Sequence, residues 1–329
     1  MAVDFETQGV VYDLTADWKG KPNLDALSLR LIGACHAAAL SGRDLALRAV
    51  YPEANPDWTL DKVWPQVEAF LKRDTDWVRG FMRSPPQTNE MRRSLILMAG
   101  FLYLAKRFEA PMHLLEIGAS AGLNTIWDKY QYSTAVWQRL PADQEGSPVV
   151  TTDWSGVAPP VEANFEIASR AACDQNPLDL KDADAAMRLR SYIWPDQKER
   201  LSRFDAARKL AVAHDVKVEK ADAAEWLEDK LAKRPATGLT IVYHSVFFQY
   251  PPSQTREKLR YLIRNAIKTA PPDAPVAWLR FEPEGLFGPV NNKADMTLET
   301  EFSPDGERVI LARSDGHVTR VAALAALAE

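Results

Sequence analysis

Several classes of protein are excluded by what this sequence lacks. Its 329 residues include only two cysteines, Cys35 and Cys173, which lie far apart and show no metal-site spacing. The five histidines form no HxH or HxxxH pair, so a histidine-based metal site is not expected. The opening residues, MAVDFETQGVVYDL, lack the apolar core of a signal peptide. We therefore expect a cytoplasmic protein without a metal.

Long apolar runs and basic blocks are also missing. No run approaches the roughly 18 apolar residues that a membrane span needs. The net charge is −5 and no lysine- and arginine-rich block is present, which disfavours nucleic acid as the main partner. With 46% hydrophobic and 26% charged residues, the composition is that of a soluble globular protein. A small-molecule substrate is the expected partner, and the oligomeric state stays open.

The chain divides into two parts by its hydrophobic periodicity. Residues 1–110 predict helices and no strand, with the clearest helical patterns at 24–40, at 58–73 with an interruption at Pro65, and at 87–110. We interpret this part as a helical region that covers a cleft. Residues 111–329 predict a second part in which strands and helices alternate.

The alternating part predicts an α/β domain with a mostly parallel sheet covered on both faces. A helix is expected directly after the first strand, and a single helix over 182–214 after the second. Residues 131–164 break the rhythm and are interpreted as an insertion. The segments MTLETEF, SPDG and ERVILAR predict a C-terminal antiparallel hairpin. The expected strands are 112–118, 165–174, 216–222, 237–246 and 274–285.

The stretch LLEIGASAGLN, residues 114–124, has two interpretations. GASAG fits G-x-S-x-G, the turn that presents a nucleophilic serine in hydrolases, which would make Ser120 the nucleophile. Its acid and histidine would then come from Asp174 or Asp222 and from His244 or His317. However, that elbow normally follows several earlier strands, whereas here it follows the first one.

The second interpretation is a loop that holds a nucleoside cofactor at the carboxyl ends of the strands. Small residues from Gly118 to Gly122 would let the backbone approach the ligand. Asp174 and Asp222 end the next two strands, where acids could bind a ribose and an adenine, although each could instead cap a helix. The spacings G-x-G-x-x-G and GK[ST] are absent, which disfavours NAD and a phosphate loop.

LLEIGASAG resembles motif I of the S-adenosylmethionine-dependent methyltransferases. Further segments over roughly residues 85–320 resemble an uncharacterised bacterial family that is described only as a domain of unknown function. The resemblance implies a methyltransferase-like Rossmann fold, S-adenosylmethionine as cofactor, and methyl transfer to an oxygen or nitrogen nucleophile. The segments are QTNEMRRS (87–94), EIGASAGLN (116–124), CDQNPLD (173–179), YIWPDQKERL (192–201), ADAAEWL (221–227), VYHSVFFQYPP (242–252) and WLRFEP (278–283).

The same resemblance implies a set of cofactor contacts. Ser120 stands where the usual loop has a glycine, so its side chain would either bond the cofactor carboxylate or crowd it. A cofactor-free protein of the same fold that binds a nucleoside or a partner is therefore a further alternative. The implied contacts are Glu116, Gly118, Ser120, Gly122 and Asn124 in the loop, Asp174 at the ribose, and Asp222 with Ala223 at the adenine.

Polar residues at the end of the fourth strand and just after it are candidates for catalysis. His244 could remove a proton from the substrate before methyl transfer, and Tyr250 is a second catalytic candidate. Ser245 and Gln249 would line the same cleft. Arg280 and Glu282 end the next strand and would either bind substrate or pair with each other.

Four polar residues open the last helix of the helical region, namely Thr88, Asn89, Glu90 and Arg93. In a helical lid they would contact the methyl donor or the substrate. The alternative is local: Thr88 or Asn89 would cap the helix, and Glu90 and Arg93 would form an exposed ion pair worth only tenths of a kcal/mol.

Overall fold

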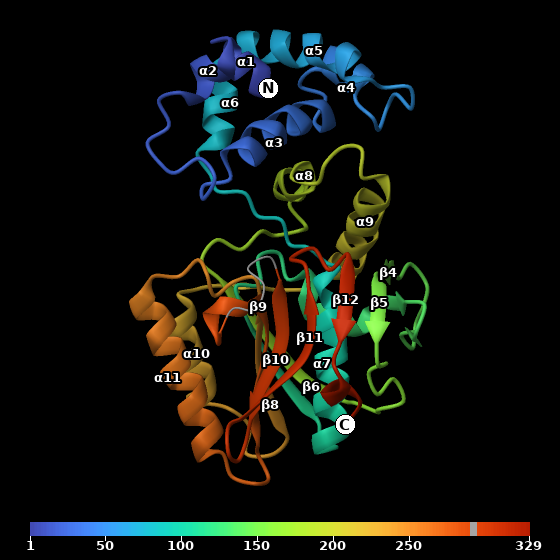
Figure 1. Cartoon of the computed structure of the whole chain (residues 1–329), viewed down its shortest axis with the longest axis vertical. Helices are drawn as coiled ribbons and strands as arrows, with labels where there is room; N and C mark the ends of the chain where they lie inside the picture. The colour runs from blue at the N-terminus through green and yellow to red at the C-terminus, as the bar shows by residue number, and fades with distance from the viewer. Residues whose placement is uncertain (290–294) are drawn as a thin grey trace. The chain divides into compact units, whose positions relative to one another are not determined.

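The computed structural model describes residues 1–289 and 295–329 (Figure 1). The chain forms two compact units, each assembled from two separate stretches. The first unit contains Met1–Thr88 and Leu180–Asp205, and the second contains Asn89–Asp179 and Ala206–Glu329. Among the described residues, no helix is both long and apolar enough to cross a membrane.

The first unit is helical and is built around α3 (Leu27–Leu40), whose alanine-rich centre is buried. Alanine and glycine allow close packing there, and a Cβ on Gly33 would lie 2.8 Å from the ring of Tyr192. Its other helices are α1 (Ala2–Glu6), α2 (Val10–Thr15), α4 (Leu45–Val50), α5 (Leu60–Arg73), α6 (Thr75–Met82) and α8 (Ala183–Ser191).

The second unit is built on a nine-stranded mixed sheet in the order β5-β12-β11-β10-β9-β8-β1-β6-β7. The run β9-β8-β1-β6-β7 is parallel, and so is the outer pair β12-β5. The strands are β1 (Met112–Ile117), β5 (Asp153–Gly156), β6 (Ile167–Asp174), β7 (Glu219–Lys220), β8 (Leu239–Ser245), β9 (Val276–Pro283), β10 (Met296–Phe302), β11 (Glu307–Ser314) and β12 (Arg320–Ala323).

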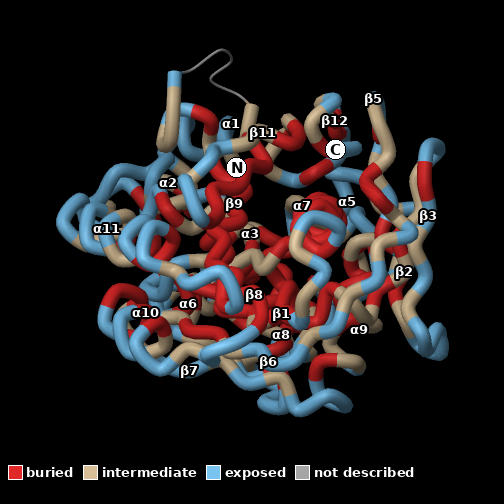
Figure 2. Tube along the Cα trace, turned by 90° about the horizontal axis from the view of Figure 1, so that it is seen from below, coloured by how far each residue is buried: buried red, intermediate tan, exposed pale blue. Residues whose placement is uncertain are grey.

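Helices cover both faces of the sheet, as a buried parallel sheet requires. On one face α10 (Ala223–Ala232) and α11 (Ser253–Thr269) bury an apolar cluster that includes Val242 and Trp278. On the other face α7 (Arg93–Phe108) packs on β9 and β10. The central strands are accordingly buried along most of their length (Figure 2).

The C-terminal hairpin has the predicted position. β10 and β11 pair antiparallel, and residues 303–306 form the turn between them. The insertion at 131–164 contains a small separate sheet of β2 (Gln131–Ser133), β3 (Gln138–Arg139) and β4 (Val149–Thr151). Its last strand, β5, pairs with β12 at the edge of the large sheet.

Two predicted helices differ from the structure. The segment after β1 is a 3-10 helix, η1 (Leu123–Lys129), because Gly122 enters it in a left-handed conformation and a kink at Ile126 interrupts it. The single helix expected over 182–214 is split into α8 and α9 (Lys198–Ala213) around Pro195, since proline lacks the amide donor that a helix interior needs. Short 3-10 turns, η2 (Glu284–Leu286) and η3 (Ala325–Ala328), complete the elements.

Other boundaries also differ. Helix α5 continues through Pro65, because Val67, Phe70 and Leu71 beyond it are anchored in the core. The predicted division at residue 110 does not coincide with that between the units, since α7 packs on the sheet and residues 180–205 join the helical unit. That the helical region covers a cleft stays a prediction.

Candidate functional site

The glycine loop lies at the carboxyl end of β1 and folds back on the end of β6. Gly118, Ser120 and Gly122 have φ of 72°, 56° and 76°, so every second residue is left-handed. The amides of Gly118 and Ala119 both donate to the carbonyl of Cys173, at 2.9 and 3.0 Å. Glycine takes this conformation without a steric cost, whereas Ser120 adopts it at a cost of about 1 kcal/mol.

Asp174 fixes this loop from the end of β6. Its Oδ2 accepts from the Ser120 amide and its Oδ1 from the Asn176 amide, both at 2.8 Å. Each carboxylate oxygen can accept a second hydrogen bond, so capacity for a ligand hydroxyl remains. The structure thus gives Asp174 a role in holding the loop, and its role at a ribose stays a prediction.

Asp222 caps helix α10. Its Oδ1 accepts from the amides of Ala224 and Glu225, at 2.9 and 3.2 Å, and Ala223 is the first residue of the helix. The capping alternative is therefore what the structure contains. Both bonds fall on one oxygen of Asp222, and contact of the other with an adenine stays a prediction.

Glu116 lies one residue before the end of β1, on the face toward α7, where it is only 2% exposed. Its Oε2 accepts a hydrogen bond of 2.9 Å from the hydroxyl of Tyr243 on the neighbouring β8. Burial raises the pKa of this carboxyl from 4.5 to about 8; the bond from Tyr243 lowers it and the charge of Asp174 raises it. Glu116 is accordingly largely protonated at neutral pH.

Aromatic side chains and two unpaired polar atoms surround this end of β1. Phe101 on α7 stacks on Trp127 with ring centroids 4.4 Å apart and meets Tyr243 edge-on at 5.1 Å. Within the described part of the chain, Asn124 Oδ1 and Trp127 Nε1 are buried without a hydrogen-bond partner. A buried polar atom without a protein partner can be satisfied by a water or a ligand.

Apolar side chains cover both loop glycines. A Cβ on Gly118 would lie 2.2 Å from the ring of Phe247, and one on Gly122 would lie 2.7 Å from Val216. These contacts, together with the positive φ, explain why glycine is needed at both positions. Phe247 therefore lies where a ligand would approach the backbone of Gly118.

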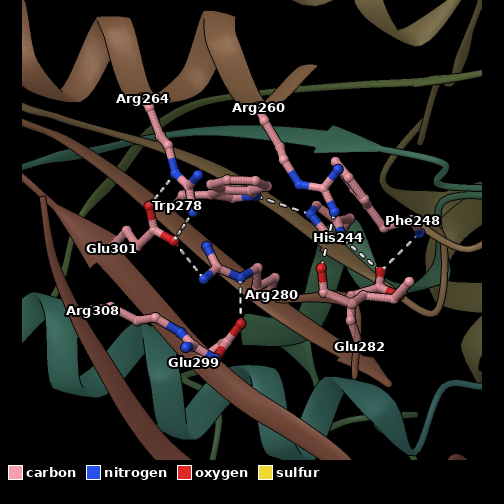
Figure 3. Close-up of polar contacts among 11 residues, drawn as sticks. His244, Phe248, Arg260, Arg264, Trp278, Arg280, Glu282, Glu299, Glu301 and Arg308 are labelled. Carbon is pink, nitrogen blue, oxygen red and sulfur yellow. Dashed lines mark hydrogen bonds and ion pairs between the residues drawn. The ribbon is translucent and has the colours of Figure 1, made fainter. Parts of the chain in front are cut away.

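His244 lies on the opposite face of the sheet, beneath α11, with no exposed surface (Figure 3). Its Nδ1 lies 2.6 Å from Glu282 Oε1, and its Nε2 accepts from the indole N–H of Trp278 at 2.9 Å. Because an indole nitrogen can only donate, the imidazole proton must be on Nδ1. Both nitrogens are engaged in the core, so this geometry does not support the expected role of His244 as a catalytic base.

Arg280 and Glu282 belong to the same buried network but do not pair with each other. Glu282 Oε1 accepts from the amides of Phe247 and Phe248, whereas Arg280 donates to Glu299 at 2.6 Å and to Glu301 at 2.7 Å. At the edge of the network, Arg308 also donates to Glu299 and Arg264 also donates to Glu301 (Figure 3). Its contacts lie in the packed interior, which fits a structural role better than substrate binding.

The four residues before and at the start of α7 lie in different surroundings. Asn89 Oδ1 accepts from the amide of Leu123 at 3.2 Å, so Asn89 holds the exit of the glycine loop. Glu90 is buried, not exposed, with His317 at 3.6 Å, and Arg93 donates to the carbonyl of Gly316. No side chain caps α7, which begins at Arg93, so the predicted cap is wrong. Thr88 ends the opening stretch of the helical unit.

Three predicted site residues lie at the end of β8 and in the segment after it. Ser245 is half-buried, Gln249 is exposed and Tyr250 is 71% exposed. Their contact with a substrate stays a prediction. Tyr243 and Phe247, in the same segment, were not predicted. The signal for Tyr243 is the parallel register, which pairs it directly with Glu116.

A metal site and a catalytic triad at Ser120 are the two other chemistries to compare with the geometry. No cluster of three histidine, cysteine, aspartate or glutamate side chains within the described residues could hold a metal. The left-handed φ of Ser120 is compatible with a strained nucleophile turn. However, His113 lies at the amino end of β1, His244 is fully engaged, and His317 lies beside Glu90.

Comparison with known proteins identifies the family. A family model described as an uncharacterised protein conserved in bacteria (DUF2332) matches residues 1–322, which includes the helical region as well as the expected segments. No curated protein and no solved structure matches the chain. The chain therefore belongs to this family of uncharacterised bacterial proteins.

Proposed function

We propose that the carboxyl edge of β1, β6 and β7 binds S-adenosylmethionine, and that the protein transfers its methyl group to an oxygen or nitrogen of a small molecule. The parallel run β7-β6-β1-β8-β9 supports a Rossmann-like fold, because it has the 3-2-1-4-5 strand order of doubly wound sheets. In such sheets ligands bind outside the carboxyl ends where the order reverses. The reversal occurs at β1 in this chain.

The observation that carries the proposal is the glycine loop at that point. Its three left-handed residues return the backbone to Cys173 and Asp174, so the ends of β1 and β6 form one surface. The residues from Gly118 to Gly122 have small side chains or none, which leaves backbone groups at the edge. This is the geometry that close approach of a nucleoside cofactor requires.

The polar groups around the loop suit such a cofactor. Asn124 contributes a buried oxygen without a partner, and Asp174 and Asp222 have unused acceptor capacity. Phe247 would have to turn away from Gly118 on binding. A bound S-adenosylmethionine would supply the methyl group, and this chain would hold donor and acceptor in line and exclude water.

Isothermal titration with S-adenosylmethionine and S-adenosylhomocysteine tests the proposal. We expect micromolar binding that is lost in Gly118→Arg. The matched control is Gly146→Arg, because Gly146 also has a positive φ of 71° but has open space around it. Phe247→Ala should bind more tightly, since it clears the backbone of Gly118. Absence of binding in the wild type and in Phe247→Ala would overturn the proposal.

A serine hydrolase remains a second candidate because of the left-handed φ of Ser120. A fluorophosphonate probe should label Ser120 if it is an activated nucleophile. No labelling, in protein that binds S-adenosylmethionine, would leave the cofactor loop as the explanation of this conformation. Nucleoside binding without transfer to any acceptor would indicate a non-catalytic protein of the same fold.

A further inference from the structure

The turn that follows β8, residues 246–250, is held by a carboxyl group from the neighbouring strand. Glu282, next to the last residue of β9, is 1% exposed, and its Oε1 accepts from the amides of Phe247 and Phe248 at 2.8 and 3.1 Å (Figure 3). The amide of Val246 donates to the carbonyl of the residue before Glu282, also at 2.8 Å. Three consecutive amides of the turn are therefore bound to the end of β9.

The turn is strained where it leaves the strand. Val246 has a φ of 52°, and a branched Cβ makes this left-handed region especially unfavourable. Glycine would adopt the same conformation at a lower cost. The bonds to β9 must therefore offset the strain, so the conformation of the turn depends on Glu282.

The two phenylalanines of the turn have different surroundings. Phe248 is fully buried, with its ring centroid 5.0 Å from that of Phe287 and the guanidinium of Arg260 over it at 4.9 Å. Phe247 is only half-buried and lies on Gly118, since a Cβ built on that glycine would be 2.6 Å from Phe247 Cγ and 3.0 Å from its Cβ. Phe248 thus anchors the turn in the core, whereas Phe247 covers the glycine loop.

A rotation of the Phe247 side chain alone would not clear the loop completely. The contact with Gly118 involves the Cβ of Phe247, whose position is fixed by the backbone, as well as the ring. Full exposure of Gly118 therefore needs a movement of the backbone at Phe247, and Glu282 holds the amide of that residue. The other carboxyl oxygen of Glu282, Oε2, is buried and has no hydrogen-bond partner in the described part of the chain, so a displaced turn has an acceptor at hand.

We propose that Glu282 holds Phe247 over Gly118 in the ligand-free protein and releases it when the nucleoside cofactor binds. This inference rests on the proposed function and adds a control on access to the same site. Glu282 does not touch the cofactor; it is a positioning residue that acts through Phe247. Because only the released fraction of the protein accepts the ligand, the hold lowers the apparent affinity by that fraction.

His244 is not required for the hold. It gives Oε1 of Glu282 one bond of 2.6 Å, whereas the amides of Phe247 and Phe248 give the other two. Loss of the imidazole therefore leaves both amides bound. A change at His244 and a change at Glu282 should differ in their effect on cofactor binding.

Hydrogen exchange of the full chain, followed by mass spectrometry, tests the release directly. Peptides over residues 246–252 report only the amides of the turn, because Pro251 and Pro252 carry none. In the ligand-free wild type we expect slow exchange there. Saturation with S-adenosylmethionine should make the exchange faster, whereas a ligand that only covered the turn would make it slower.

A double-mutant cycle measured by isothermal titration tests whether Glu282 acts through Phe247. Glu282→Met removes the acceptor and should raise the affinity for S-adenosylmethionine about tenfold, as should Phe247→Ala. The double variant should bind no more tightly than either single variant, because the side chain that Glu282 positions is gone. Glu282→Gln keeps an acceptor oxygen for both amides and should behave as the wild type.

The matched control is Glu299→Met. Glu299 is a similarly buried carboxyl of the same network, but it binds Arg280 and Arg308 and not the turn. Its loss should lower stability without changing the affinity or the exchange of the turn, whereas ligand-free Glu282→Met should exchange faster there. Thermal unfolding verifies that each variant is folded, and the exchange of the wild type decides the question if Glu282→Met is not.

The outcomes separate this inference from the proposed function. Binding of S-adenosylmethionine by the wild type with unchanged or slower exchange of the turn overturns the hold by Glu282 and leaves the cofactor proposal intact. Additive effects of Glu282→Met and Phe247→Ala do the same. Absence of binding in the wild type and in Phe247→Ala, both folded, overturns the cofactor proposal and this inference with it.

Discussion

Two groups of buried polar residues lie on opposite faces of the large sheet, and they differ in whether a buried charged group has a partner of opposite charge. Beneath α11, His244 and Arg280 are each engaged with carboxyl groups at 2.6 to 2.7 Å. We call this the His244 cluster; its members are His244, Trp278, Arg280, Glu282, Glu299 and Glu301. On the α7 face, Glu116 has a single bond from a neutral phenol.

The difference distinguishes the His244 cluster, whose charged groups pair with one another, from Glu116, whose carboxyl has no charged partner among the described residues. Buried ion pairs tolerate little change, because removing one partner leaves an uncompensated charge in the core. The His244 cluster therefore fixes how β8, β9 and β10 meet. Glu116 avoids the same penalty by remaining protonated.

The largest expected effect comes from breaking the His244 cluster at Arg280. Arg280→Met should lower the free energy of unfolding by about 3–5 kcal/mol, because Glu299 and Glu301 lose the guanidinium they share in the core and keep only the partly exposed Arg308 and Arg264. Urea unfolding measures this. Arg264→Met is the control, since Arg264 is half-exposed and should cost at most about 1 kcal/mol. Equal, small losses in both variants would contradict the structural role of Arg280.

Replacing the histidine tests the same cluster and the catalytic alternative together. His244→Phe should lose about 2–3 kcal/mol of stability, because the Trp278 indole loses its acceptor and the buried Glu282 carboxyl keeps only the backbone amides as donors. Its affinity for S-adenosylmethionine should stay at the wild-type value. A variant with unchanged stability but no methyl transfer would instead restore His244 as a catalytic base.

At Glu116 the expected effect is a change in pH dependence. Folding raises its pKa from 4.5 to about 8, so its stabilising contribution is complete below about pH 4.5 and is lost as the pH rises through 8. This single group makes stability fall by up to about 1.4 kcal/mol per pH unit between those values. Glu116→Gln should remove that slope, which urea unfolding at several pH values would detect. Parallel pH curves for the two proteins would mean that Glu116 does not carry the buried proton.

The sequence predicted the sheet well because its signals are local. The apolar runs of β8 and β9 and the turn between β10 and β11 can be read without knowledge of their neighbours. The rule that parallel strands present their carboxyl ends at one edge also placed Glu116, Asp174 and Asp222 correctly at the ends of strands or just after them.

The sequence does not predict on which face of the sheet a side chain lies or which residue is its hydrogen-bond partner. His244 lies near the end of its strand as expected, but only the fold brings Trp278 and Glu282 to its two nitrogens. Glu116 and Tyr243 become neighbours through the register of β1 and β8, and no local pattern encodes it. Residues 180–205 likewise join the helical unit of residues 1–88 through packing between segments that are distant in the sequence.

The smallest expected effect compares two helix caps that are nearly identical in geometry. Asp222 caps α10 with bonds of 2.9 and 3.2 Å, and Asp182 caps α8 with bonds of 2.8 and 3.4 Å. Replacing either by alanine should cost about 1 kcal/mol of stability. If Asp222 also contacts the adenine, only Asp222→Ala should weaken binding of S-adenosylmethionine in the titration. Equal affinities in the two variants would assign Asp222 to helix capping alone, and adenine recognition would then have to come from other groups at this edge of the sheet.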